Sequence, residues 1–246
     1  MTARFLPFFL PSCTIRTGVS HIQEGRFLYL KKRNRKCFGS AVCLHAAFVC
    51  WTAAVRLVDV QAIGPYGSVV GFAYLNGFLH RLTGVHMSLY RLTDWLSLIP
   101  IGFAVGFALL GLYQWIRRKD IRKVDRSLLV LGGFYLAVLA AYVFFEIIPV
   151  NHRPVLLDGY LEASYPSSTT MLVLCIMPTA ALQLRTRIRR RVFRNCVCRG
   201  IYGFTGLMVL LRFLSGVHWF TDIAGGILLS AGLVLLYISF LPPESR

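Results

Sequence analysis

Three ionisable side chains interrupt the apolar C-terminal part of the chain, in Arg212-Phe213-Leu214-Ser215-Gly216-Val217-His218-Trp219-Phe220-Thr221-Asp222. Ionisable residues are costly within or near a bilayer, so they indicate a functional site there. His218 and Asp222 are four residues apart, which places them on one face of a helix, where a carboxylate can orient an imidazole. Arg212 offers a planar fork for a phosphate. The alternative is an interfacial histidine between two charges that reach water.

The composition of the chain indicates a membrane protein with several spans. Hydrophobic residues make up 56% of the 246 residues, and charged residues make up only 15%, which is too apolar for an ordinary soluble domain. We expect an all-α, polytopic protein with six transmembrane helices in one domain over residues 29–246, and a poorly ordered extension over residues 1–28. The expected spans are Phe38–Val58, Trp95–Ile116, Leu128–Ile148, Thr169–Leu184, Ile201–Leu214 and Trp219–Leu241.

The net charge of +17 is distributed as a topology signal. Lys31–Lys36, Arg117–Arg126 and Arg185–Arg199 carry five, six and seven of the 27 basic residues, and these clusters flank alternate spans. The positive-inside rule then predicts both termini and these clusters in the cytoplasm of a bacterial plasma-membrane protein. The opposite segments, which hold the ionisable blocks, are predicted to face the extracytoplasmic side. Because the charge has this arrangement, we do not expect nucleic acid as a partner.

Two upstream blocks accompany Arg212–Asp222, namely Asn151-His152-Arg153-Pro154 and Tyr165-Pro166-Ser167-Ser168-Thr169-Thr170. In order and spacing the three blocks resemble the type-2 phosphatidic-acid phosphatase family, which reads Lys-x6-Arg-Pro, then Pro-Ser-Gly-His, then Ser-Arg-x5-His-x3-Asp. The resemblance spans roughly Phe38 to Leu241. The third block is the most specific, because its Arg-x5-His-x3-Asp pattern is matched throughout.

The resemblance implies a role for each matched residue. His218 is the expected nucleophile, which forms a phosphohistidine, and Asp222 holds its far ring nitrogen. Arg153 and Arg212 are expected to bind the phosphate. Ser167 and Ser168 precede the fourth span, so their hydroxyls and the helix N-terminus offer further donors. A serine at that place can equally be a helix cap without a ligand.

The chain departs from the family pattern at four positions. Glu146 replaces the lysine of the first block, Ser168 and Thr169 replace the glycine and histidine of the second, and Leu211 precedes the arginine of the third. Thr169 is a poor general acid. His152, a water molecule held by Thr169 or no acid at all could take over protonation of the leaving group, although His152 can also be an exposed loop histidine. Glu146 is expected to weaken the positive field of the site.

The segment Ser68–Arg91 has Phe72, Leu75, Leu79 and Leu82 at helical spacing, which predicts an interfacial helix between the first two spans. It could guide lipid into the site or simply cover the end of the bundle.

The sequence therefore predicts a membrane phosphatase for lipid phosphates or isoprenyl diphosphates, with the bilayer and a lipid substrate as partners and with no cofactor and no metal site, since no Cys-x-x-Cys or acidic cluster has ligand spacing. Two alternatives remain, a catalytically weak protein that binds lipid phosphate and a transferase that passes a lipid head group to an alcohol. A transporter is disfavoured by the lack of an internal repeat.

Overall fold

The structure is a computed structural model, which describes residues 15–241. Helices dominate this part of the chain, and only isolated β-bridges occur in its loops. The helices are α1 (Ile15–Leu57), α2 (Ala73–Thr83), α3 (Met87–Leu96), α4 (Leu98–Arg118), α5 (Arg126–Ile147), α6 (Ser168–Arg187), α7 (Arg191–Leu214) and α8 (Phe220–Phe240). The expected all-α architecture is therefore confirmed for the described residues.

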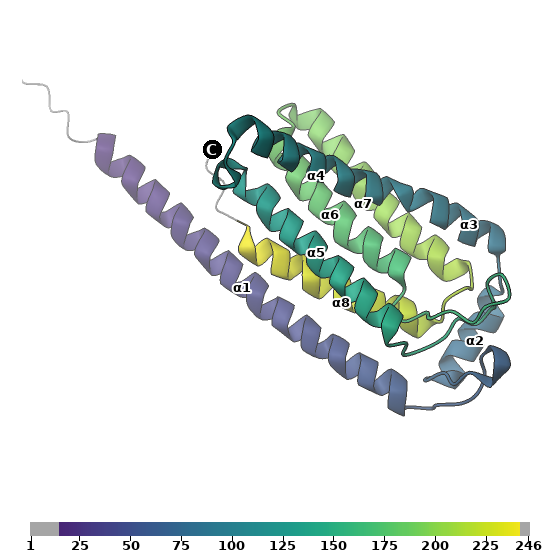
Figure 1. The fold of residues 1–246 in the computed structure, drawn as a ribbon. Coiled ribbons are helices and arrows are strands. Elements are labelled where there is room, and N and C mark those ends of the chain that lie inside the picture. The colour runs from purple at the N-terminus through teal and green to yellow at the C-terminus, as the bar shows by residue number, and fades with distance from the viewer. Residues whose placement is uncertain (1–14, 242–246) are drawn as a thin grey trace, which may run out of the picture.

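Within residues 15–241, five segments are long and apolar enough to cross a membrane: Lys32–Leu57, Met87–Arg118, Arg126–Ile147, Arg191–Leu214 and Phe220–Phe240. The remaining expected span, Thr169–Leu184, corresponds to α6, which lies in the centre of the bundle between α4, α5, α7 and α8 (Figure 1). Because protein surrounds α6, it can carry buried polar side chains such as Thr179 and Gln183. Gln183 donates hydrogen bonds to the hydroxyl of Tyr237 and to the backbone carbonyl of Ser127, at 2.8 and 3.0 Å. The chain is an integral membrane protein.

Two elements differ from the sequence-based expectation. The segment Ser68–Arg91 is not one helix, because α2 ends at Thr83 and Gly84 takes a positive φ of 67°. The following helix begins at Met87 and joins α4 at Ser97, so the second span starts earlier than the expected Trp95. The expected extension covers residues 1–28. Residues 1–14 lie outside the described part of the chain, and residues 15–28 belong to α1.

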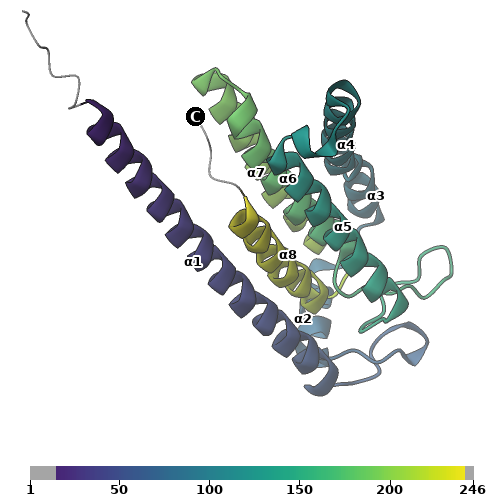
Figure 2. The same ribbon diagram turned by 60° about the vertical axis from the view of Figure 1, so that its left-hand side comes forward.

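The helix α1 packs along α8 and runs past the end of the bundle (Figures 1 and 2). The side-chain amide of Asn34 donates to the backbone carbonyl of Leu241 at 3.3 Å, so the first basic cluster lies level with the end of α8. The α4–α5 and α6–α7 connections, which carry the other two clusters, lie at the same end (Figure 1). All three basic clusters therefore gather at one end of the bundle.

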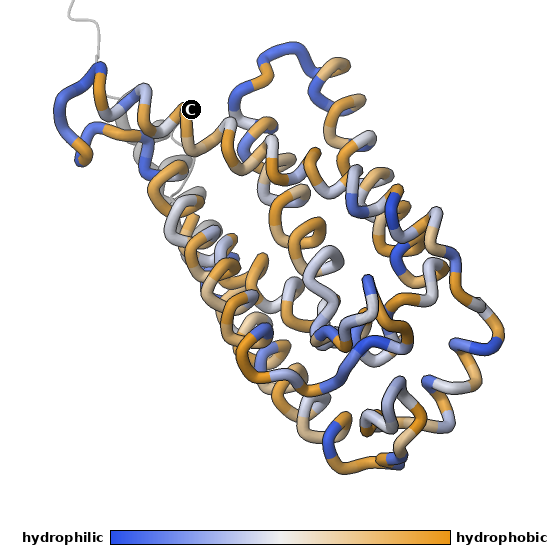
Figure 3. Tube along the Cα trace, turned by 45° about the vertical axis from the view of Figure 1, so that its right-hand side comes forward, coloured by the Kyte–Doolittle hydropathy of each residue, from blue (hydrophilic) through white to orange (hydrophobic). Residues whose placement is uncertain are grey.

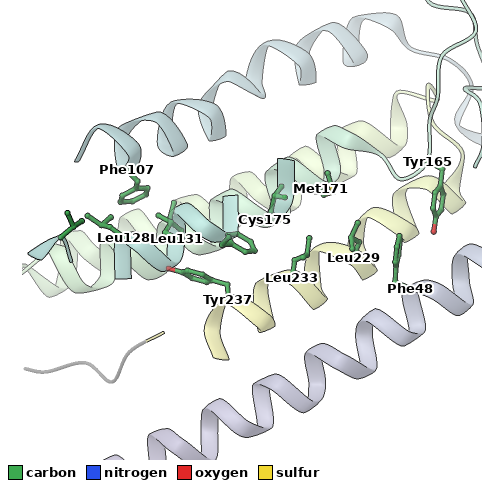
Figure 4. Close-up of a cluster of buried hydrophobic side chains, with 14 of the residues drawn as sticks. Phe48, Phe107, Leu128, Leu131, Tyr165, Met171, Cys175, Leu229, Leu233 and Tyr237 are labelled. Carbon is green, nitrogen blue, oxygen red and sulfur yellow. The ribbon is translucent and has the colours of Figure 1, made fainter. Parts of the chain in front are cut away.

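The main apolar core joins α1, α5, α6 and α8. Figure 4 shows side chains from Phe107, Leu128 and Tyr237 near one end of the bundle to Phe48 and Tyr165 near the other. The rings of Phe48 and Tyr165 stack with centroids 6.1 Å apart. Hydrophobic residues follow the helices and hydrophilic residues concentrate in the connections (Figure 3), as expected for a protein whose helices face lipid.

Candidate active site

The three blocks meet at the end of the bundle opposite the basic clusters. The loop after α5, the N-termini of α6 and α8, the C-terminus of α7 and the short helix α2 all lie there (Figure 1). Within the third block, Gly216 has a φ of +67°, and a Cβ atom at this position would lie 1.8 Å from the carbonyl oxygen of Gly84. The turn that carries His218 therefore requires glycine, because the α2–α3 connection packs directly against it.

His218 is 4% exposed and lies between an arginine and a carboxylate. Its Nε2 atom is 3.2 Å from Nη1 of Arg153. Arginine can only donate, so this contact fits a neutral imidazole with its lone pair on Nε2 and its hydrogen on Nδ1. Burial lowers the pKa of His218 well below its ordinary value, and the charges of Arg153 and Arg212 lower this pKa further. The imidazole is therefore held neutral, which is the form that a nucleophile needs.

Asp222 lies on the other side of the ring and is fully buried. Its Oδ2 atom is 3.8 Å from Nδ1 of His218, which is beyond hydrogen-bond distance. The carboxylate instead accepts hydrogen bonds from the side-chain amide of Asn151 at 3.1 Å and from the backbone N–H of Trp219 at 3.0 Å. Asp222 thus caps the N-terminus of α8 and at the same time lies beside His218.

An amide network extends from Asp222 to α2. The side chain of Asn76, which is 1% exposed, accepts from the backbone N–H of Thr221 at 3.2 Å and donates to the hydroxyl of Thr221 at 3.0 Å. Asn151 also donates to this hydroxyl, at 3.4 Å. The position of Asp222 is therefore tied to α2 as well as to the first block.

Arg153 is held by the loop between α5 and α6. Its backbone N–H donates to the carbonyl of Glu162 at 3.0 Å, and its Nε atom is 3.0 Å from Oε2 of the same residue. The side chain of Arg153 is 9% exposed, whereas that of Glu162 is 44% exposed. Arg153 thus faces His218 with one nitrogen and a carboxylate with another.

Arg212, from the last turn of α7, is bound by α3. Its Nη1 atom donates to Oδ1 of Asp94 at 2.8 Å and to the hydroxyl of Thr93 at 3.0 Å. The ring of Tyr90 lies with its centroid 4.7 Å from the guanidinium carbon of Arg212 and 5.9 Å from that of Arg153. The two arginines therefore flank one aromatic ring, an arrangement that stabilises each cation.

The N-terminus of α6 brings only part of the second block to the site. Ser168 is the first residue of α6 and lines a cavity beside His218. Ser167 is fully buried, where its hydroxyl accepts from Thr170 at 3.0 Å and its backbone N–H donates to the carbonyl of Asp222 at 3.1 Å. Thr169 is buried and is not among the residues that line this cavity. The second block thus joins α6 to α8 and presents Ser168 to the site.

The cavity has a volume of about 340 Å³ and a mostly polar lining. Four of the residues singled out in the sequence contribute to it: Glu146, Arg153, Ser168 and His218. The other lining residues are Tyr142, Phe145, Glu162, Ala163, Ser164, Tyr165, Pro166 and Met171. His152 is half-buried and does not line the cavity, and its backbone carbonyl accepts from the indole of Trp219 at 2.8 Å.

Several neighbours of the site were not anticipated from the sequence. Asp94 is a lone acid within an apolar helix, and this signal alone could have identified it. Ser164 lines the cavity, and nothing in its sequence context distinguishes it. Among the described residues, no group of three or more histidine, cysteine or acidic side chains could hold a metal ion.

Comparison with known proteins agrees with the motif resemblance. The PAP2 superfamily matches residues 146–246, which include all three blocks. The similarity to the type-2 phosphatidic-acid phosphatases is thereby confirmed for this part of the chain. The crystal structure of a transmembrane PAP2-type phosphatidylglycerolphosphate phosphatase from Bacillus subtilis is also similar, with 20% identity, a TM-score of 0.45, and coverage of 81% of this chain and 93% of that chain. No curated protein matches the chain.

Proposed function

We propose that the protein is a membrane phosphatase that hydrolyses a lipid phosphate or isoprenyl diphosphate through a phosphohistidine at His218. The match of residues 146–246 to the PAP2 superfamily supports a phosphatase. The observation that carries the mechanism is the position of His218, whose Nε2 atom faces Arg153 at 3.2 Å in a polar cavity. A neutral imidazole nitrogen next to a guanidinium is the arrangement that an attack on a phosphate requires.

The proposed reaction has two displacements at phosphorus. Nε2 of His218 attacks the phosphate held by Arg153, the phosphorus–oxygen bond of the ester or anhydride breaks, and the leaving oxygen takes its electron pair. A water molecule then attacks the phosphohistidine, the phosphorus–nitrogen bond breaks, and inorganic phosphate leaves. Asp222 stabilises the imidazolium that forms during the first displacement. Arg212 acts on the same site through its charge and through the Tyr90 ring that it shares with Arg153.

Protonation of the leaving group is the step at which this chain differs from its family. Thr169 stands in place of the family histidine, is buried, and is not part of the cavity lining. We infer that water in the cavity protonates the leaving oxygen. A phosphate leaving group is a weaker base than an alkoxide, so a diphosphate depends less on this proton.

We further propose that the site faces the extracytoplasmic side. The three basic clusters lie at the opposite end of the bundle, and the positive-inside rule assigns such clusters to the cytoplasm.

A second candidate function is a protein that binds lipid phosphate without turnover. Each site arginine already has a carboxylate partner, since Arg153 pairs with Glu162 and Arg212 with Asp94. Occupied arginines bind a phosphate less strongly, which favours this candidate. A head-group transferase is a third, in which an alcohol replaces water in the second displacement.

Phosphate release from radiolabelled lipid phosphates, measured on the purified full-length protein, tests the proposal. We expect His218→Ala to abolish both release and the acid-labile phosphoenzyme. The matched control is His86→Ala, because His86 is exposed and its ring contacts only the carbonyl of Thr83 in its own turn. Hydrolysis that persists in His218→Ala contradicts the mechanism, and binding without release in the unaltered protein supports the second candidate.

A further inference from the structure

Two carboxylates that the proposed reaction does not use line the cavity beside His218. Glu146, from the last turn of α5, and Glu162, from the loop before α6, both line it. Glu146 is exposed, and the side chain of Glu162 is 44% exposed. Both carboxylates are therefore within reach of a ligand that occupies the cavity.

Formal charges show how these two carboxylates affect the binding of a phosphate. The lining contains one cation, Arg153, and two carboxylates, Glu146 and Glu162, while His218 is held neutral. Arg212 lies outside the lining, and Asp94 balances its charge. The cavity thus carries an excess of one negative charge. A phosphate that brings no cation of its own enters an environment of like charge, which disfavours its binding.

The ion pair between Arg153 and Glu162 adds a second constraint. A phosphate that takes the guanidinium of Arg153 leaves the carboxylate of Glu162, 3.0 Å away, without its partner and next to a new anion. Removing one partner of such a pair is costly when the other stays partly buried. A ligand with a cation beside its phosphate avoids this cost, because the phosphate pairs with Arg153 while the cation pairs with Glu162.

The rest of the lining suits an organic cation. Tyr142 and Phe145 also line the cavity, and aromatic faces attract ammonium groups. Ser164 lines the cavity as well, and a serine hydroxyl can accept a hydrogen bond from an ammonium group. A divalent metal ion is the other cation that could accompany a phosphate, but the described residues offer no group of three or more ligands for one.

We propose that the preferred substrate is a lipid phosphate that carries an ammonium group close to its phosphate ester, with Glu146 and Glu162 as the residues that select for it. This inference rests on the proposed phosphatase function and narrows its substrate class. The phosphate occupies the side of the cavity formed by Arg153 and His218, and the ammonium group occupies the side formed by the two glutamates. Ester cleavage itself is the same two-step displacement at His218.

Two substrates that differ only in the ammonium group test the proposal. They are octadecyl phosphate and its analogue with an amino group on the second carbon of the chain, each presented in detergent micelles to the purified full-length protein. We expect kcat/KM at neutral pH to be at least about tenfold higher for the amino analogue, the ratio that one satisfied charge contact typically gives. Glu146→Gln and Glu162→Gln should each reduce this ratio, by lowering kcat/KM for the amino analogue and raising it for octadecyl phosphate.

The matched control is Asp158→Asn, which removes a carboxylate from the same loop at an exposed position outside the cavity lining. It should leave the ratio unchanged. Equal kcat/KM values for the two substrates, or a ratio that survives both glutamate substitutions, overturn the proposal. So does a preference that disappears when magnesium is added and returns with a chelator, because the cation is then a metal ion.

Ligand-induced thermal stabilisation by the same two lipids provides a readout that needs no turnover. Hydrolysis of both lipids at equal rates rejects only the ammonium preference. Absence of hydrolysis rejects the proposed phosphatase function. The preference for the ammonium group is then decided by which of the two lipids stabilises the protein more at equal concentration.

Discussion

Asp94 of α3 accepts a hydrogen bond from Arg212 of α7 at 2.8 Å, across 118 residues of sequence. Arg212 is 2% exposed, so its charge depends on this carboxylate, on the hydroxyl of Thr93 and on the ring of Tyr90. The short helix α3 thereby positions Arg212, an arginine of the third block whose contact with α3 was not expected from the sequence. Any change in α3 is expected to reach the site through this contact.

The first prediction concerns this pair. Asp94→Ala leaves a buried guanidinium without its anionic partner, and we expect it to lower the stability of the protein by ~1–3 kcal/mol. Asp94→Asn keeps an oxygen that accepts from Arg212, so it should cost less. Thermal denaturation of the purified protein in detergent measures both, with Asp158→Asn as the control. If Asp94→Ala melts at the same temperature as the control, the contact does not hold Arg212.

The second prediction separates the charge of the two arginines from their shape. Lysine keeps the charge of Arg153 or Arg212 but loses the planar fork. We expect Arg153→Lys to remove ~2–4 kcal/mol of transition-state stabilisation, similar to the loss of one oxyanion donor elsewhere. Arg212→Lys should cost less, because Arg212 lies outside the cavity lining and acts through a charge that lysine keeps. Kinetics of phosphate release measure this effect, and Arg199→Lys, an exposed position in the α6–α7 basic cluster, is the control. An Arg153→Lys variant as active as the control removes this arginine from the proposed phosphate site.

The sequence predicts the helices well because long apolar stretches between basic clusters have few other solutions in a membrane. It also placed the three blocks at one end of the bundle, since alternate connections between spans lie on the same side. The division of Ser68–Arg91 into two helices was not predictable from periodicity. It depends on the backbone of Gly84, which lies against Gly216 from a distant part of the chain.

The partners of the site residues were equally hidden in the sequence. Ser167 and Ser168 are adjacent, but the hydroxyl of Ser167 is buried against Thr170, while Ser168 lines the cavity. Which of the two faces a ligand depends on the rotation of α6 about its axis, and this rotation depends on packing against α4, α5, α7 and α8. The pairing of Arg153 with Glu162 likewise depends on how the loop between α5 and α6 folds back on itself.

The third prediction tests the proposed orientation in the membrane. Tyr160 is 74% exposed at the site end, and Val192 is 78% exposed at the end with the basic clusters. In a background without native cysteines, Tyr160→Cys should react with an impermeant thiol reagent in intact cells, whereas Val192→Cys should react only after the cells are opened. The reverse pattern places the site in the cytoplasm.

The fourth prediction follows from the lowered pKa of His218. Burial, then Arg153, then Arg212 disfavour the imidazolium, so His218 stays neutral at pH values where an ordinary histidine is protonated. Attack on phosphorus needs the neutral ring. The acid limb of kcat/KM should therefore lie below the ordinary histidine pKa of about 6.5.

The same shift has a consequence for stability, whose sign is fixed by proton linkage. The unfolded chain binds a proton at this histidine that the folded protein does not bind. The stability that depends on a neutral His218 is therefore fully present above the ordinary histidine pKa and is lost as the pH falls below it. The variant His218→Gln keeps a neutral polar side chain and cannot take up this proton. Between about pH 7.5 and about pH 5, the melting temperature of the unaltered protein should fall further than that of His218→Gln. Equal decreases would show that His218 is not held neutral by its surroundings.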